Sequence, residues 1–234
     1  NVRLRRMGNL ARYLSDHTHM VEWFSVSFDH YKKIQRVSEN TTYNLSDNYK
    51  LHLVKVPGYK KNISLARIFH HWISARKILK MMESISQKPD IIIASMEPLE
   101  NSSISVKYSN QHHIPSIIDV RDLWPEIYYE VIPRYLHPLL HIYVWWASKV
   151  LSFTMKGASS IIGLSEDFLD YGLKYARRNK NILDSVIPIG YPNYDYSEFR
   201  GNFKELYYRF NIKEQDFIIL FLGNFGNQFN FTPI

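Results

Sequence analysis

The residues best suited to chemistry lie together in one stretch, Asp119-Val120-Arg121-Asp122-Leu123-Trp124-Pro125-Glu126. The apolar run 114–118 precedes it and is typical of a buried strand. In an open α/β sheet, ligands bind just outside the carboxyl ends of the strands. This mixture of carboxylates, a guanidinium and an indole therefore predicts a binding loop for a polar ligand.

Each side chain of this stretch suits a different part of a sugar or phosphate ligand. Asp119 or Asp122 could accept hydrogen bonds from hydroxyl groups. Arg121 could face a phosphate, and Trp124 could stack on the face of a sugar. A purely local role is the alternative for Asp122, which could cap a following helix with Pro125 in its first turn.

Two other strand ends add polar residues to the expected cleft. Ser95 follows the predicted strand 90–94, and Glu166 follows the predicted strand 160–164. Both could face a ligand at the same edge of the sheet. Ser165 and Glu166 also suit the first turn of a helix, and capping alone would explain them.

Phosphate-binding candidates lie near the two ends of the sequence. Gly223-Asn224-Phe225-Gly226 follows an apolar run, and glycines there would let the backbone approach a diphosphate. Arg5 and Arg6, with Arg3, could bind phosphate through two parallel hydrogen bonds. The ordinary alternatives are a tight turn for the glycines and a solvated face for the arginines.

Strands and helices alternate along the chain, which predicts βαβ units. The fold class is therefore α/β, with a mainly parallel Rossmann-like sheet covered by helices on both faces. The expected strands are 20–25, 50–56, 90–94, 114–118, 160–164 and 185–189, and the expected helices are 4–14, 65–82, 99–111, 136–155 and 165–178.

The domain organisation follows from the same pattern. Residues 1–189 form the first domain, which opens on a helix and is therefore expected to lack its first strand. Residues 190–202 have the glycine, proline and polar composition of a linker. Residues 203–234 resemble the start of a second domain, with a short helix at 204–210 and a buried strand at 217–222.

Composition narrows the classes of function. The 234 residues include no cysteine, so a disulfide framework and a thiolate metal site are excluded. The adjacent pairs His70/His71 and His112/His113 lack the spacing of a zinc site, and no metal is expected. The net charge of +7 favours phosphate-bearing partners. No signal peptide or membrane span is predicted.

An aromatic segment leaves two interpretations open. An apolar stripe at helical spacing is expected to face the protein core. It comprises Leu139, Leu140, Tyr143, Val144, Ala147, Val150 and Leu151. Trp145 and Trp146 lie off this stripe. With Lys149 and Lys156 nearby, they could rest on a membrane surface.

Several segments resemble family 4 glycosyltransferases of the GT-B fold. Arg3–Leu14 is similar to their first helix, and His19–Phe24 with Phe28-Asp29-His30 to their second strand. The run Asp119–Glu126 resembles the most distinctive motif of a branch that builds bacterial surface polysaccharides. Three later segments resemble motifs of the family and follow in the family's order along the chain. These segments are Gly163–Glu166, Pro188–Tyr191 and Phe221–Gly226. One departure is Ser95-Met96-Glu97-Pro98, where Glu97 replaces a small residue or proline.

The resemblance implies two Rossmann-like domains with a cleft between them. The first would hold a saccharide or lipid-linked acceptor, and the second a nucleotide-sugar donor. Transfer would retain the anomeric configuration, with no metal or other cofactor. The enzyme would act in capsule, O-antigen or exopolysaccharide synthesis, in the cytoplasm or peripherally at the inner face of the cell membrane. Since the donor domain is cut short, the segment is expected to be inactive by itself.

Three other functions compete with this interpretation. A sugar-nucleotide epimerase shares the two-domain design. A nucleic-acid-binding module would fit the basic charge. Such a module needs basic and aromatic residues interleaved on one surface, whereas the aromatic residues here mostly follow the periodicity of a core. No nucleic-acid partner is therefore expected. A non-catalytic interaction fragment of a polysaccharide assembly complex is the third.

Overall fold

The computed structural model describes residues 6–190, 203–213 and 215–221. The chain divides into two compact units, 1–190 and 191–234, and each is described by itself. The helices of the first unit are α1 (Arg6–Asp16), α2 (Leu65–Ser84), α3 (Leu99–Gln111), α4 (Tyr128–Val131), the 3₁₀ helix η1 (Arg134–Leu136), α5 (His137–Gly157) and α6 (Glu166–Ala176). Its strands are β1 (Val21–Val26), β2 (Phe28–Asp29), β3 (Ile34–Gln35), β4 (Thr41–Ser46), β5 (Tyr49–Val54), β6 (Ile92–Ser95), β7 (Ser116–Val120), β8 (Ser160–Gly163) and β9 (Ser185–Val186).

The strands form two larger sheets and a short hairpin. Strands β6, β7, β8 and β9 pair in that order, and every pair is parallel. Strands β1 and β5 are also parallel, whereas β4 joins the outer edge of β5 in the antiparallel direction. The predicted α/β class with a mainly parallel, Rossmann-like sheet is therefore confirmed. No strand precedes α1 in the described part of the chain, and β1 is not paired with β6 there.

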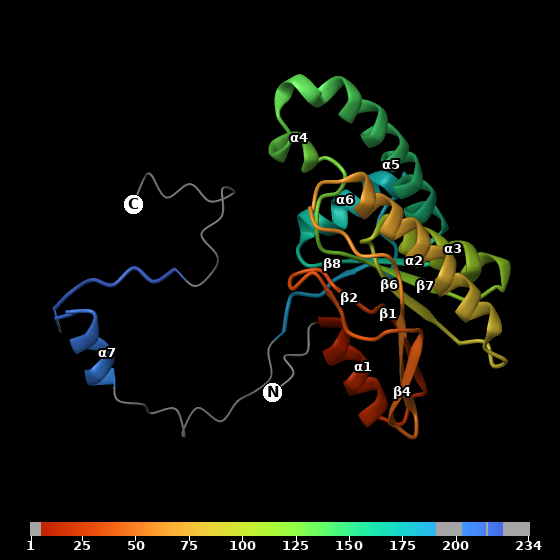
Figure 1. Ribbon diagram of the computed structural model, residues 1–234, viewed down its shortest axis with the longest axis horizontal. Helices are drawn as coiled ribbons and strands as arrows, with labels where there is room; N and C mark the ends of the chain where they lie inside the picture. The colour runs from red at the N-terminus through yellow and green to blue at the C-terminus, as the bar shows by residue number, and fades with distance from the viewer. Residues whose placement is uncertain (1–5, 191–202, 214, 222–234) are drawn as a thin grey trace. The chain divides into compact units, whose positions relative to one another are not determined.

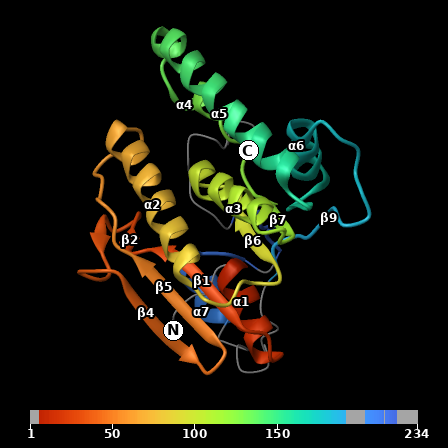
Figure 2. The same ribbon diagram turned by 90° about the vertical axis from the view of Figure 1, so that its right-hand side faces the viewer.

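The helices cover the strands on both sides. Helix α1 packs on β1 and β5, on the side opposite to α2 (Figure 1). Helices α2, α3, α5 and α6 form one layer in which each packs against the next, with α3 between α2 and α5 (Figure 2). One hydrophobic core lies between α3, α5, α6 and the four-stranded sheet. A second lies under α2 and α3 and includes Val54 of β5 and Ile92 of β6, so it spans both larger sheets.

Local sequence signals explain where several helices begin and end. Ser64 caps α2, since its Oγ accepts a hydrogen bond from the Arg67 backbone nitrogen at 3.3 Å. The predicted helix 99–111 forms with those bounds as α3. Helix α6 ends at Arg177, whose positive φ of 54° breaks the helical hydrogen-bond pattern.

The antiparallel part of the first unit lies in a region where no strand was predicted. Strand β4 is exposed along nearly its whole length, and β2 and β3 have two residues each. An exposed strand needs no apolar alternation, and two-residue strands are too short to show one. Strand β4 reaches β5 through the turn Asp47-Asn48, which lacks the glycine of the strongest hairpin signal.

The apolar stripe of α5 is buried, with one correction. Leu140, Val144, Ala147 and Leu151 lie in the core, whereas Leu139 is 69% exposed. In the described part of the chain, no helix combines the length and the apolar character that crossing a bilayer requires.

The second unit contains α7 (Phe203–Arg209) at the position of a predicted helix. The predicted buried strand at 217–222 is wrong for residues 217–221, which form no strand and have exposed side chains. A strand exists only when its backbone pairs with another, and the described residues of this unit supply no second strand. Leu222 lies outside the described residues.

Candidate functional site

The carboxyl ends of β6 and β7 lie side by side and carry the predicted site residues. Ser95 and Asp119 are register partners at the ends of these two parallel strands. The guanidinium of Arg121 donates to Ser95 Oγ at 2.7 Å, so the two strand ends are also joined through side chains. The parallel order thus brings together residues that lie 26 positions apart in the sequence.

Asp119 is the buried centre of this strand edge. Its side chain is fully buried, and its Oδ2 accepts from Arg6 Nε at 3.0 Å. Arg121 Nε lies 3.6 Å from the same oxygen, and Arg6 Nη1 also donates to the Pro188 carbonyl at 2.9 Å. Two guanidinium groups compensate this buried carboxylate, as a buried charge requires. Asp119 therefore organises the strand end, and it is Asp122 that lies at the exposed rim.

Arg6 contributes to the strand edge from α1, far away in the sequence. The sequence predicts Arg5 and Arg6 as phosphate-binding residues, and Arg5 lies outside the described residues. The structure places Arg6 between Asp119 and Pro188, with a side chain that is 14% exposed. A guanidinium that is already engaged by a carboxylate and a carbonyl has fewer donors left for a phosphate.

Glu97 is a carboxyl group that the site keeps protonated near neutral pH. Burial is the main cause that raises its pKa, to about 8, and the nearby Asp122 carboxylate raises it further against Arg67 and Arg121. Its Oε1 is buried and has no hydrogen-bond partner among the described residues. A neutral carboxyl can both donate and accept a hydrogen bond, which an ionised one cannot do.

A histidine and a second glutamate extend the buried polar cluster behind Glu97. Arg67 Nε donates to His71 Nε2 at 3.5 Å, and His71 Nδ1 faces Glu100 Oε2 at 3.6 Å. Burial, assisted by the charge of Arg67, lowers the pKa of His71 to about 3, so this imidazole is neutral. Burial also raises the pKa of Glu100. Burial thus favours the neutral forms of both side chains.

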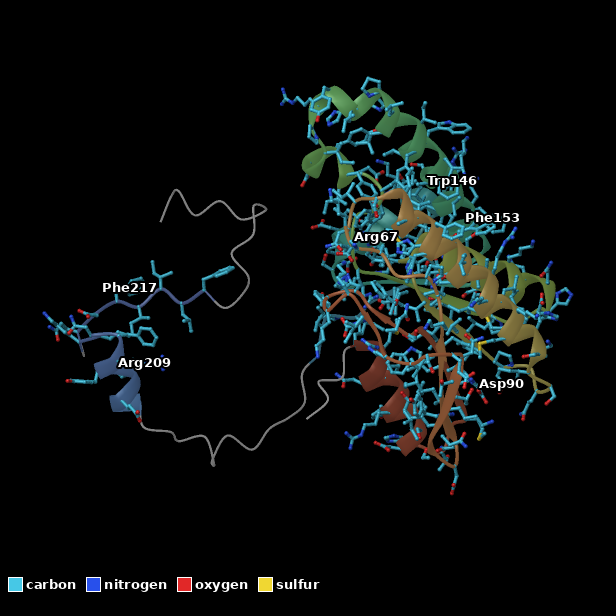
Figure 3. The ribbon with its side chains drawn as sticks, in the orientation of Figure 1. Arg67, Asp90, Trp146, Phe153, Arg209 and Phe217 are labelled. Carbon is cyan, nitrogen blue, oxygen red and sulfur yellow. The ribbon has the colours of Figure 1, made fainter. Side chains whose placement is uncertain are left out.

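Trp124 forms an aromatic wall of the site. The Arg67 guanidinium lies 5.7 Å from the centre of its ring, and Tyr128 packs edge-on at 4.4 Å. Arg67 itself is fixed by a hydrogen bond from Nη1 to the Asn62 carbonyl at 2.9 Å. Figure 3 labels Arg67, whose side chain lies near the N-terminal end of α2.

The loop that carries Trp124 is held from α6. The Tyr171 hydroxyl donates to the Trp124 carbonyl and to Glu126, and the Tyr175 hydroxyl donates to the other oxygen of Glu126. Burial, followed by the Glu126 carboxylate, raises the pKa of Tyr171. The last residue of the motif is therefore an acceptor that positions the loop.

Asp122 does not cap a helix. The next helix, α4, begins only at Tyr128, and its first turn has no capping side chain. The backbone between them forms turns, with Ile127 bonded to Leu123 and Tyr128 to Pro125. Partial burial raises the pKa of Asp122, against the effect of Arg121. Its carboxylate remains at the exposed rim of the site.

Other predicted residues are not joined to this cluster. Glu166 opens α6 with a 70% exposed side chain and lies 3.7 Å from Lys180. Ser165 has the extended backbone of a cap residue but makes no capping hydrogen bond. Gly223, Asn224, Phe225 and Gly226 lie outside the described residues.

The histidine pairs do not gather into a metal site. His70 Nδ1 lies 2.6 Å from the Pro57 carbonyl, whereas His71 faces Arg67 and Glu100. Over the part of the chain that the structure describes, no three His, Cys, Asp or Glu side chains come together as a set that could hold a metal ion.

The sequence interpretation missed Glu97, Arg67, His71 and Glu100 as members of one cluster. Glu97 had a visible signal, because an acid two residues after a strand end is unusual in an apolar setting. Arg67 and His71 had none, since their place depends on how α2 packs beside α3. Compared with protein-family models and with curated proteins, the chain matches none.

Proposed function

We propose that this chain is the acceptor-side part of a retaining glycosyltransferase of the GT-B fold. It would transfer a sugar from a nucleotide-sugar donor to a saccharide or lipid-linked acceptor in bacterial surface-polysaccharide synthesis. One observation supports this proposal most strongly. It is the buried Glu97 carboxyl, whose pKa is raised by burial, near Arg67 and Arg121, with Arg67 facing the ring of Trp124. These groups together suit a ligand rich in hydroxyl groups.

Each group of the cluster has a separate task in this proposal. Glu97 donates one hydrogen bond to an acceptor hydroxyl and accepts another. Trp124 stacks on an apolar sugar face, and Asp122 accepts from a hydroxyl at the rim. Arg67 and Arg121 supply positive charge, which would stabilise a diphosphate that develops negative charge during transfer. Glu126, Tyr171 and Tyr175 position the Trp124 loop.

The second part of the proposal comes from the resemblance and not from the described site. A second domain, beginning after the linker, would bind the donor diphosphate through a glycine loop, and no metal would take part. The acceptor would be lipid-linked, so the protein would act at the inner face of the cell membrane. A membrane-peripheral position is compatible with the basic charge of the chain.

Saccharide binding to the 234-residue chain tests the acceptor site directly. Saturation-transfer NMR with a panel of alkyl glycosides should show contacts that Trp124→Ala and Glu97→Met remove, since methionine keeps the size of the side chain and removes its hydrogen-bonding oxygens. Glu83→Met, at an exposed position on the last turn of α2, is the matched control and should bind as the original chain does. Circular dichroism spectra would establish that each variant is folded.

The outcome separates the proposal from its competitors. Saccharide binding that persists unchanged in both site variants would overturn the assignment of the acceptor site. In a parallel assay with a radiolabelled nucleotide sugar, label moving to the glycoside when this chain is joined to a complete donor domain supports transfer, whereas the 234-residue chain alone should transfer none. An altered free nucleotide sugar, with no labelled glycoside, would instead establish an epimerase.

A further inference from the structure

Two helices of the first unit carry apolar faces that no described residue covers. On α2, Leu65 is 83%, Phe69 is 52% and Trp72 is 45% exposed, at helical spacing. On α5, Ile142 is 68% and Trp145 is 65% exposed. The remaining members of these faces are Ile68, Leu139, Trp146 and Phe153. Trp146 and Phe153 project from the same outer side of α5 (Figure 3).

The segments that carry these faces also account for the positive net charge of the chain. Segments 57–82 and 131–165 contain nine Lys and Arg and no Asp or Glu. The rest of the chain contains 20 Lys and Arg against 22 Asp and Glu. The net charge of +7 is therefore concentrated on the two stretches that expose tryptophan, phenylalanine and leucine.

Basic and aromatic side chains are paired on both helices. The Arg76 guanidinium lies 3.7 Å from the centre of the Trp72 ring on α2. Lys149 Nζ lies 5.6 Å from the centre of the Trp145 ring on α5. An indole beside a cation suits the boundary between lipid headgroups and acyl chains, where one side is polar and the other apolar.

The two faces lie at the same end of the fold as the candidate site. Arg67, in the first turn of α2, faces Trp124, and Tyr143 of α5 packs edge-on against Tyr128 at 5.4 Å. The N-terminal halves of both helices thus adjoin the loop after β7. A partner that binds to these two helix faces would therefore lie next to the candidate site.

We propose that the exposed faces of α2 and α5 form a docking surface for a bilayer that contains anionic phospholipid. The apolar side chains enter the headgroup boundary, and the surrounding Lys and Arg bind the phosphates. The surface stands on its own residues, whereas its purpose of presenting a lipid-linked acceptor to Glu97 rests on the proposed function. A second copy of this chain fits less well, because two such faces would bring like charges together.

Co-sedimentation with vesicles tests the surface. The chain should bind vesicles of phosphatidylcholine and phosphatidylglycerol, and bind vesicles of phosphatidylcholine alone at least ~10-fold more weakly, because several cations each contribute about fivefold. Added salt should weaken the binding, since it screens exposed charges. Equal binding to both kinds of vesicle, or none at low salt, would overturn the proposal.

Variants locate the surface. The double change Phe69→Glu with Trp145→Glu should reduce binding at least ~10-fold, since it places charge where apolar groups must enter. Leu45→Glu on β4, a site that is 54% exposed, is the matched control and should leave binding unchanged. For the charges, Lys149→Gln should weaken binding about fivefold. Arg12→Gln on α1, which packs on the side of the strands opposite to α2, should not. Equal losses in test and control variants would contradict the proposal.

Two further measurements distinguish a bilayer from a second copy of the chain, and the docking surface from the proposed acceptor site. Light scattering without vesicles would detect self-association; a dimer that Trp145→Glu disperses, with no vesicle binding by the original chain, would assign the face to a second copy. Glu97→Met should still bind vesicles while losing saccharide binding. Failure of the surface and failure of the acceptor site would therefore appear in separate assays.

Discussion

Arg6 and Asp119 form a buried ion pair across 113 positions of the sequence, with Nε and Oδ2 3.0 Å apart. The pair fastens the start of α1 to the carboxyl end of β7. Because Arg6 also donates to the Pro188 carbonyl, it connects the first helix, a central strand and the segment after β9 at one point. The geometry of the candidate site depends on this contact, since Arg121 shares the same carboxylate.

Asp119→Asn should destabilise the first unit by about 3–5 kcal/mol, because it leaves two guanidinium groups next to an uncharged, buried partner. Urea denaturation followed by tryptophan fluorescence would measure the loss. Asp16→Asn is the control, since its pairing with Arg12 is on the surface at 3.7 Å and should change the free energy of unfolding by less than about 0.5 kcal/mol. Similar losses in both variants would contradict the importance of the buried pair.

Glu97 should make the stability of the original chain fall as pH rises. Its pKa is about 8 in the folded state against 4.5 for an unperturbed glutamate, so the folded state binds the extra proton between these values. Unfolding free energy should therefore decrease by up to about 1.4 kcal/mol per pH unit from pH 4.5 to 8, relative to Glu97→Gln. Urea midpoints at several pH values measure this, and parallel curves for the two proteins would refute it.

Asp184 should show the opposite pH dependence. Burial alone would raise its pKa, but hydrogen bonds from Arg178 and from the backbone of Asn181 and Ile161 outweigh burial and lower it. A lowered carboxyl pKa stabilises the fold above the unfolded value, near 4, and this contribution disappears as pH falls through the folded value. Asp184→Asn should thus be clearly less stable than the original chain at pH 7, with a smaller difference at pH 3.

The exposed Asp170→Asn on α6 serves as the control for Asp184. It should track the original chain at both pH values in thermal or urea unfolding. A difference for Asp184→Asn that stays constant with pH would mean that lost packing, and not ionisation, causes the destabilisation.

Gly163→Ala tests the close approach of α6 to β8. A Cβ at Gly163 would lie 2.4 Å from the Leu169 backbone nitrogen and 2.9 Å from the Ser165 carbonyl oxygen, so backbone would have to move. The expected cost is about 1–3 kcal/mol in the free energy of unfolding. Gly190→Ala, where a Cβ would meet nothing within 4 Å, should be nearly neutral. An equally neutral Gly163→Ala would show that the strand-to-helix junction is loosely packed.

The parallel core of the fold could be predicted from the sequence, and its antiparallel edge could not. Apolar runs and cap residues predicted α2, α3 and β7 to within a few residues, because buried elements must show the periodicity of their geometry. Strand β4 lacks that signal, because it is stabilised mainly by backbone pairing with β5. The run at 217–221 had the signal of a buried strand, but strand formation also needs a partner.

The candidate site was partly predictable for a similar reason. A parallel sheet aligns the ends of its strands, so the proximity of Ser95 and Asp119 followed from strand order alone. The contact of Arg67 with Trp124 depends on the side-by-side packing of helices, which periodicity does not specify. The protonation of Glu97 is a property of its burial among other charges, so only the folded arrangement reveals it.

The two larger sheets share a core without sharing backbone hydrogen bonds in the described part of the chain. The two sheets are therefore held together by apolar side chains beneath α2 and α3. Such cohesion weakens on cooling, whereas ladder hydrogen bonds do not share that dependence. Amide hydrogen exchange should then proceed faster along β1 and β6 than along β7, whose backbone is paired on both sides. Local opening of the first unit is therefore expected first between its two sheets, and more readily as the temperature falls.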